Sequence, residues 1–257
     1  MHKISILVVT LMITLFSTQN SYGWGKEGHH MVAEVAWHYM NQHTQEMVTK
    51  YLNGITVDSA ATWMDDVRSD PKYKYMSSWH FINIPKGQEY VPNPAETNCI
   101  NEMNKACNNL KNGKLSDDEK RINIMVLIHL WGDLSQPLHT GYAEDRGGNM
   151  VTITFNGKET NLHSLWDGGI IYDRKIKLDN CLALYAHLSE KEKEECKKFN
   201  NVAALKQSRS FLPQIYDFED ASIDEVYAVK NQAVIEKQIL TGGLRLAAML
   251  DDVFKKQ

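Results

Sequence analysis

The sequence predicts a mainly α-helical protein with one small β-hairpin, and two observations support this fold class. Apolar residues recur at helical spacing over much of the chain, and the longest such runs cover 28–52, 122–134 and 223–254. Only Val151–Phe155 alternates apolar and polar residues like a strand. Asn156-Gly157 follows this stretch and is the strongest short signal for a hairpin turn.

Local signals define several helix ends. Ser116 and Glu119 have the spacing of a capping box at the start of the central apolar helix, and Pro137 ends that helix. Shorter helices are predicted over 58–67, 99–110 and 189–200. No linker rich in Pro, Gly or Ser interrupts residues 24–257, so we predict that this range forms a single helical domain.

The N-terminus has the pattern of a secretory signal peptide. A lysine precedes the apolar run 4–16, and the small residues Ser21 and Gly23 stand where a signal peptidase recognises its substrate. The run is too short to span a membrane. A buried N-terminal helix is the alternative, but charge, apolar run and small residues come in the order of a signal peptide. We expect removal of residues 1–23, a mature chain that begins at Trp24, and a secreted or periplasmic location away from membranes.

Charge and cysteine content narrow the chemistry. The formal net charge is -4, whereas a protein that holds duplex DNA by charge alone is usually basic, so a nucleic-acid enzyme of this composition needs bound metal. Four cysteines in an exported chain predict two disulfides. Cys99 and Cys107 lie about 12 Å apart on one predicted helix, too far to bridge each other. The pairing of these two with Cys181 and Cys196 stays open.

Two His-x-x-x-Asp pairs point to metal binding. His129 and Asp133 form one pair, and His163 and Asp167 form the other. On a helix such residues project from one face, where an imidazole nitrogen and a carboxylate oxygen can reach one ion. A hydrogen-bonded core histidine with an acidic partner explains a single pair equally well. Asp133 lies in an otherwise apolar helix, where an unpaired carboxylate is costly, which favours the metal interpretation.

The full set of candidate ligands exceeds one metal site. It contains eight side chains: His29, Asp65, His80, His129, Asp133, His139, His163 and Asp167. Imidazole and carboxylate without thiolate suit zinc, and less specifically manganese or iron. A catalytic zinc keeps about three protein ligands, so the set indicates two or three ions. Clustered ions of this kind suit phosphoester hydrolysis.

The motifs that carry these residues resemble a known family. Trp24-Gly25-Lys26-Glu27-Gly28-His29, Asp65, His80 and the two His-x-x-x-Asp pairs follow in the order found in the trinuclear-zinc single-strand nucleases and 3′-nucleotidases of fungi, plants and bacteria. The resemblance runs from Trp24 to Asp167 and, more loosely, through the C-terminal helices. It implies a helical fold of the zinc-dependent nuclease and phospholipase C type.

The resemblance also implies an activity and a set of ligands. We expect an exported zinc-dependent phosphodiesterase that cleaves single-stranded DNA and RNA to 5′-phosphate products, with 3′-nucleotides as further substrates and no obligate protein partner. It implies three zinc ions with the following ligands: the first Asp65, His80, His129 and Asp133; the second His139, His163 and Asp167; the third His29, Asp133 and the α-amino nitrogen and carbonyl oxygen of Trp24. Only cleavage after Gly23 makes that amine a free ligand.

Three further residues are predicted to bind substrate. Phe81 matches a family position that stacks on a nucleobase, and the alternative is a core phenylalanine. Asn83 stands where some relatives have an aspartate that binds the base, so base preference is open. Arg68 lies one helical turn after Asp65 and suits a phosphate oxygen, although a surface arginine is the alternative. Asp65 and Arg68 are the predicted catalytic residues.

Two other functions compete with this interpretation. A zinc-dependent phospholipase C shares the superfamily and the N-terminal tryptophan ligand. Its pattern has glutamate at the position of Asp167 and a longer gap between Trp24 and His29, so the sequence favours the nuclease. A non-catalytic zinc-binding protein tolerates disordered His-rich tracts, whereas these ligands are placed singly on predicted rigid segments.

Overall fold

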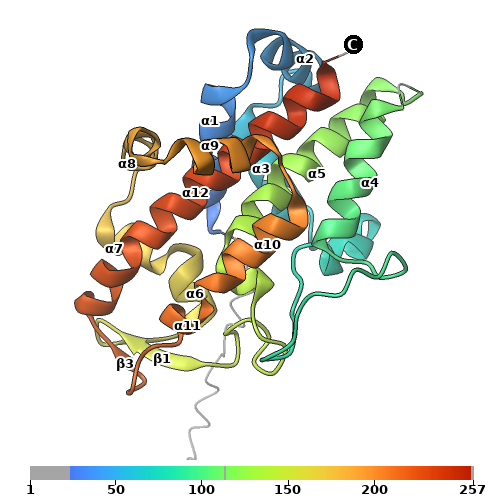
Figure 1. Cartoon of the computed structure of the whole chain (residues 1–257). Helices are drawn as coiled ribbons and strands as arrows, with labels where there is room; N and C mark the ends of the chain where they lie inside the picture. The colour runs from blue at the N-terminus through green and yellow to red at the C-terminus, as the bar shows by residue number, and fades with distance from the viewer. Residues whose placement is uncertain (1–23, 113, 256–257) are drawn as a thin grey trace, which may run out of the picture.

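Helices make up most of the structure, a computed structural model that describes residues 24–112 and 114–255 (Figure 1). The mainly α fold class is confirmed. The predicted signal peptide, residues 1–23, lies outside the described residues. None of the helices in the described ranges combines the length and the apolar composition that a membrane span requires.

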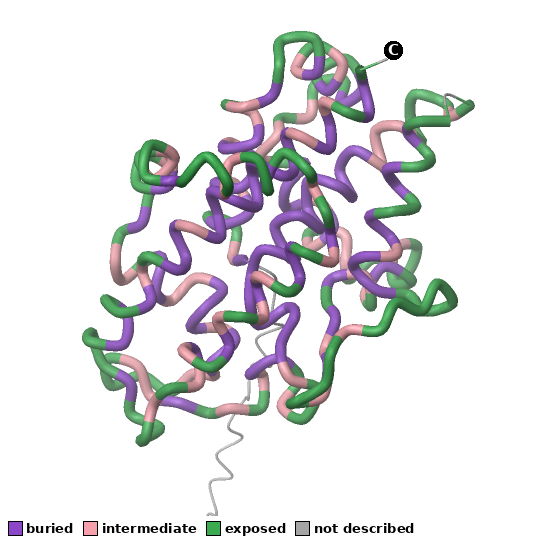
Figure 2. Tube along the Cα trace, in the orientation of Figure 1, coloured by how far each residue is buried: buried purple, intermediate pink, exposed green. Residues whose placement is uncertain are grey.

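Three long helices form the centre of the molecule. They are α1 (Lys26–Tyr39), α5 (Asp117–Ser135) and α12 (Glu225–Phe254). Each packs against the other two, and α3 (Val57–Asp66), α4 (Cys99–Lys111) and α10 (Asn201–Ser210) pack around α5. Figure 2 shows the buried residues concentrated along the central helices, while exposed residues gather on the outer turns. The core therefore lies where α1, α5 and α12 meet.

Two glycines on α12 allow this close packing. A Cβ atom on Gly242 would lie 2.8 Å from the Cβ of Ser135 on α5, and one on Gly243 would lie 2.5 Å from the Cβ of Val35 on α1. Either contact is closer than carbon atoms tolerate. The absence of both side chains lets α12 lie directly against α1 and α5.

Shorter elements complete the described chain. They are α2 (Gln42–Leu52), the 3₁₀ helix η1 (Pro71–Ser78), the 3₁₀ helix η2 (Pro137–Thr140), α6 (Leu162–Ser164), the π-helical turn η3 (Leu165–Gly169), α7 (Ile170–Arg174), α8 (Leu178–Ala183), the 3₁₀ helix η4 (Leu184–His187), α9 (Glu190–Lys197) and α11 (Leu212–Ile215). Elements α6, η3 and α7 follow one another without a break.

The predicted capping box is confirmed and one predicted helix is corrected. Ser116 and Glu119 exchange hydrogen bonds between side chains and backbone at the start of α5. The helix predicted over 28–52 is in fact two helices. The side chain of Asn41 accepts a hydrogen bond from the N–H of Thr44 and thereby starts α2, although the apolar periodicity continues through this point.

A three-stranded sheet contains the predicted hairpin. Strand β1 (Thr152–Phe155) pairs antiparallel with β2 (Lys158–Asn161). Asn156 and Gly157 in the turn both have positive φ angles, 48° and 77°, as a tight two-residue hairpin requires. The sequence did not predict β3 (Ser222–Ile223), which pairs parallel with β1. A strand of two residues is too short to show alternation.

The prediction of two disulfides is wrong for this structure. All four cysteines are buried free thiols: Cys99, Cys107, Cys181 and Cys196. They lie on three helices, α4, α8 and α9. The Cys99 thiol lies 3.7 Å from the carbonyl oxygen of Leu130 and 3.7 Å from the sulfur of Met103, so it is held within the core. An even number of cysteines predicts pairing only when the fold brings the thiols together.

We expect four titratable thiols per chain when the purified protein is unfolded in guanidinium chloride without reductant. In the folded protein these thiols should react slowly, because burial raises the pKa of Cys99 well above its ordinary value and that of Cys181 to about 12. Titration with a chromogenic disulfide reagent before and after unfolding measures both. Two or fewer thiols in the unfolded protein would show that disulfides form.

Candidate metal centre

The eight predicted side-chain ligands converge where α1, α3 and α5 meet. They form three groups: His29, His129 and Asp133; Asp65, His80 and His129; and His139, His163 and Asp167. Within each group the potential ligand atoms lie within 4.8 Å of one another. Seven of the eight residues are buried, and Asp65 is nearly so. The structure therefore brings together every side chain that the sequence predicted as a ligand.

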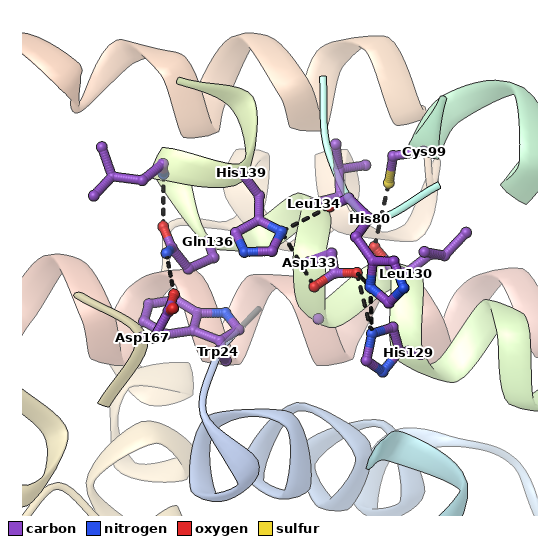
Figure 3. Close-up of polar contacts among 12 residues, drawn as sticks. Trp24, His80, Cys99, His129, Leu130, Asp133, Leu134, Gln136, His139 and Asp167 are labelled. Carbon is purple, nitrogen blue, oxygen red and sulfur yellow. Dashed lines mark hydrogen bonds and ion pairs between the residues drawn. The ribbon is translucent and has the colours of Figure 1, made fainter. Parts of the chain in front are cut away.

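The group around Asp65 has the spacing of ligands to a single ion. His80 Nδ1 lies 3.0 Å from His129 Nε2, and these two nitrogens lie 3.1 and 3.2 Å from Asp133 Oδ2 (Figure 3). Asp65 Oδ1 lies 3.8 and 3.9 Å from the same nitrogens. Ligands on a tetrahedral zinc stand about 3.3 Å apart, because Zn–N and Zn–O bonds are about 2.0–2.2 Å long.

Backbone carbonyls fix the orientation of three imidazoles. His129 Nδ1 donates to Ala61 O at 2.6 Å, His139 Nδ1 to His80 O at 2.7 Å, and His163 Nδ1 to Gly147 O at 2.5 Å. A carbonyl oxygen can only accept, so each Nδ1 must carry the proton. In the neutral form of each ring, Nε2 is then the electron-pair donor, as in many metal sites.

Buried polar atoms without a hydrogen-bond partner mark the same place. Among the described residues they include both ring nitrogens of His29, Asp65 Oδ1, Asp133 Oδ1, His139 Nε2 and His163 Nε2. Each such atom costs about 1–3 kcal/mol when it stays unsatisfied. Nearly all of these atoms are electron-pair donors that face other donors. A bound cation satisfies such a set, so the residues fit a metal.

Electrostatics hold most of these groups in the protonation state that binds metal. Burial lowers the pKa of His29 and His139, and it lowers that of His163 to about 3, so these imidazoles are neutral. Burial alone would raise the pKa of Asp133, but the imidazoles around it, His129 foremost, hold it well below its ordinary value. Neutral histidine and ionised aspartate are the forms that coordinate zinc.

The pKa shifts of His129 and Asp167 oppose the protonation states that bind metal, and a bound cation would reverse both shifts. Burial lowers the pKa of His129, but Asp133 and Asp65 outweigh it and raise that pKa to about 9. Burial raises the pKa of Asp167 well above its ordinary value. Without a cation, these shifts favour the charged form of His129 and the neutral form of Asp167. A cation beside them would favour the opposite forms, and metal binding would therefore release protons.

Two close contacts require glycine around the N-terminal motif that contains Trp24 and His29. The Trp24 side chain is completely buried, and a Cβ on Gly28 would lie 2.6 Å from the Cβ of Trp24. A Cβ on Gly132 of α5 would overlap the ring of His29. The N–H that follows Trp24 donates to the carbonyl oxygen of Asp167 at 2.6 Å. Glycine at these positions thus lets Trp24 and His29 approach closely. Figure 3 shows Trp24 beside Asp167.

The predicted substrate residues lie on an extended segment beside the metal groups. Ile82 N–H donates to His139 O at 2.8 Å, and Ile84 N–H donates to Gly141 O at 3.1 Å. Both isoleucines are buried. Because side chains alternate along an extended chain, Phe81 and Asn83 face the other way. Phe81 is 40% exposed, which argues against the alternative of a core phenylalanine.

Arg68 also lies near the metal groups. It lies two residues after the end of α3, and its N–H donates to the carbonyl oxygen of Asp65 at 3.2 Å. Its positive charge contributes to the lowered pKa of His163. The guanidinium is therefore within electrostatic reach of the site, although Arg68 and His163 lie far apart in the sequence.

Sequence reasoning missed two residues that position ligands. Gln136 donates from Nε2 to Asp167 Oδ1 at 2.6 Å and accepts from the N–H of Leu138 at 2.6 Å. Gly147 supplies the carbonyl that orients His163, and its φ of +64° suits glycine. Both residues stand in short motifs near candidate ligands, Gln-Pro-Leu-His and Gly-Gly-Asn, and this proximity was the available signal. A single sequence does not show which groups are in contact.

Comparison with known proteins identifies the family of this chain. A family model described as S1/P1 nuclease matches residues 24–255. The chain belongs to the S1/P1 nuclease family. Endonuclease 4 of Arabidopsis thaliana is 26% identical over an alignment of 291 positions that covers 98% of this chain and 94% of the relative. Endonuclease 3 of the same plant is 28% identical over an alignment of 286 positions that covers 98% of this chain and 94% of that relative. Nuclease P1 of Penicillium citrinum is 32% identical over 155 residues, which cover 56% and 57%.

Membership of the S1/P1 nuclease family gives the chemical class. The chain is a hydrolase of nucleic-acid phosphoester bonds, and single-stranded nucleic acids are its class of substrate. The family is known to use zinc, and the His and Asp groups described above can hold it.

Replacing Gly147 with alanine should weaken metal binding at the His139, His163 and Asp167 group by roughly 10–100-fold, the usual effect of losing a group that orients a ligand. The new Cβ would overlap the carbonyl oxygen of Leu138 and displace the loop that holds His163. Zinc affinity measured by competition with a chromogenic chelator tests this.

The matched control is Gly157→Ala in the hairpin turn. Gly157 has a similar φ of +77°, but a Cβ there meets nothing within 4 Å. This variant carries comparable backbone strain without the overlap, so its zinc affinity should equal that of the wild type. Equal losses in both variants would contradict a specific role of the Gly147 loop.

Proposed function

We propose that this chain is an exported zinc-dependent nuclease with three zinc ions. It hydrolyses single-stranded DNA and RNA to products with 5′-phosphate and 3′-hydroxyl ends, and it removes the phosphate from 3′-nucleotides. The observation that carries this proposal is the set of three adjoining His and Asp groups, whose buried electron-pair donors lack hydrogen-bond partners.

Asp133 is the residue that supports adjoining ions. Its Oδ2 lies 3.1 and 3.2 Å from the nitrogens of His80 and His129, whereas its Oδ1 lies 3.5 Å from His29 Nε2. The two oxygens thus face two different groups of ligands. We assign Asp65, His80, His129 and Asp133 to the first ion, and His29 and Asp133 with the backbone of Trp24 to another.

The remaining ion takes His139, His163 and Asp167. The tautomers of His139 and His163 leave Nε2 free in both rings, and the centroids of the two rings lie 4.9 Å apart. When bound, zinc supplies Lewis-acid stabilisation of phosphate charge and lowers the pKa of water. A protein of net charge -4 gains in this way the local positive charge that a polyanionic substrate needs.

The residues around the metal groups suit a single-stranded substrate. Phe81 is exposed beside His80, where a nucleobase can stack on its ring. A base stacked on protein cannot remain stacked inside a duplex, so this contact favours single strands. Asn83 holds a buried side-chain oxygen without a partner among the described residues, which suits a donor group on a base. Arg68 suits a phosphate oxygen near Asp65.

A panel of substrates tests the proposed function. We expect the mature protein to cleave single-stranded DNA and RNA, to release phosphate from a 3′-nucleotide and to leave phosphatidylcholine intact, with all activity lost to a chelator and restored by zinc. End-group analysis of a digested oligonucleotide should find 5′-phosphate. Products with 3′-phosphate, equal rates on a matched duplex, or cleavage of the phospholipid would each contradict the proposal.

Export and site assembly are coupled in this proposal. An α-amine coordinates metal only as a free N-terminus, and Trp24 gains one when the chain is cleaved after Gly23. The structure brings residue 24 beside Asp167, since the next N–H donates to the Asp167 carbonyl. In this proposal the mature enzyme is secreted or periplasmic, and the uncleaved chain lacks the N-terminal ligand.

A mature chain with one extra methionine ahead of Trp24 should lose one zinc ion and most of its activity. The added peptide bond removes the free amine while every side-chain ligand stays in place. Elemental analysis of the extended and the correctly cleaved proteins, purified side by side, measures the difference. Full zinc content and full activity in the extended form would rule out the N-terminal ligand.

A further inference from the structure

A buried hydrogen bond ties the N-terminal tryptophan to the end of α5. Trp24 Nε1 donates to Ser135 Oγ at 2.9 Å across 111 residues of sequence. Ser135 Oγ in turn donates to Gly132 O at 2.8 Å. Trp24 is completely buried and Ser135 is 4% exposed. The hydroxyl therefore serves both partners away from solvent, and the indole N–H has a single acceptor in the described residues.

The other side of Ser135 is held as firmly. Gln238 of α12 donates from Nε2 to Ser135 O at 2.7 Å and to Ser208 Oγ at 2.9 Å. Ser208 Oγ donates to Leu134 O at 2.6 Å. Gly242 lets α12 pack directly against Ser135, as described above. These contacts place the hydroxyl at one fixed point between α5, α10 and α12.

We propose that Ser135 is a positioning residue that holds the Trp24 indole and thereby sets the backbone amine and carbonyl of residue 24 beside the metal groups. The proposal rests on the proposed function, in which that backbone is a zinc ligand. Residue 24 is the first of the described chain, and its N–H and carbonyl belong to no helix. Its position therefore depends on its side chain and on the hydrogen bond of Gly25 to Asp167.

The experiment compares three mature proteins: Ser135→Ala, Trp24→Phe and the double variant. Ser135→Ala removes the acceptor, and Trp24→Phe removes the indole N–H while it keeps the N-terminal amine. Each should bind the most weakly held zinc roughly 10–100-fold less tightly, as when other residues that orient ligands are lost. The double variant should be no worse than the more affected single variant, because both substitutions break the same bond.

A readout without metal accompanies the zinc measurement. In the metal-free wild type, the Trp24 indole N–H signal in the NMR spectrum, assigned by its loss in Trp24→Phe, should exchange slowly with solvent. In Ser135→Ala it should exchange at least tenfold faster. The conservative variant Ser135→Cys retains a weak acceptor and should recover part of the zinc affinity.

A matched control separates positioning from a general loss of stability. Trp166 Nε1 donates to Tyr227 OH at 2.9 Å, also in the core, so Tyr227→Phe breaks the same kind of bond elsewhere. Its zinc content should stay that of the wild type. The positioning role is overturned if this control loses as much zinc as Ser135→Ala. It is also overturned if the losses add in the double variant, or if Ser135→Ala binds zinc as tightly as the wild type. Fewer than three ions in the wild type overturns the proposed function itself, and is seen without any substitution.

Discussion

The carboxylate of Asp133 is the constraint on which the rest of this structure depends. It is completely buried on a central helix, and four imidazoles surround it: His29, His80, His129 and His139. An ionised carboxylate at such a place is costly unless positive charge compensates it. The surrounding histidines hold its pKa low, and two of them, His29 and His139, have ring nitrogens without hydrogen-bond partners. Bound cations would compensate this carboxylate and satisfy the unpartnered nitrogens.

The fold serves this requirement by close approach of backbones. Gly28 and Gly132 bring Trp24 and His29 to α5, and Gly242 and Gly243 bring α12 against α1 and α5. Each glycine removes a side chain at a helix contact, at a cost in helix propensity of about 1 kcal/mol. These contacts produce a compact centre in which candidate ligands from distant parts of the chain lie within a few ångströms of one another.

The candidate ligands could be named from sequence because the two His-x-x-x-Asp pairs are local patterns and the ordered motifs resemble a known family, and the structure brings these side chains together. A histidine and an aspartate four residues apart in an apolar helix favour metal, although a hydrogen-bonded core pair explains one such pattern equally well, and several His and Asp elements along one chain strengthen the metal interpretation. The capping box at Ser116 and the Asn156-Gly157 turn are predictable for the same reason, since residues a few positions apart determine them. The predicted roles of Phe81 and Arg68 in substrate binding stay predictions, although both residues lie beside the metal groups.

Features that depend on distant contacts were not predictable. The Trp24–Ser135 hydrogen bond joins residues that are 111 positions apart, and neither local sequence predicts it. The expected disulfides failed because an even number of cysteines says nothing about where the helices place their thiols. The helix break at Met40 was missed because apolar periodicity continues across it, while a single capping asparagine decides the local geometry.

The central claim is that buried ligands shared through Asp133 assemble three adjoining zinc ions. Anomalous X-ray diffraction from crystals of the mature, cleaved protein, recorded on both sides of the zinc absorption edge, tests it most directly. The account predicts three anomalous peaks, with two of them next to the two oxygens of Asp133 and the third between His139, His163 and Asp167. A single peak, or peaks that do not contact Asp133, would contradict it.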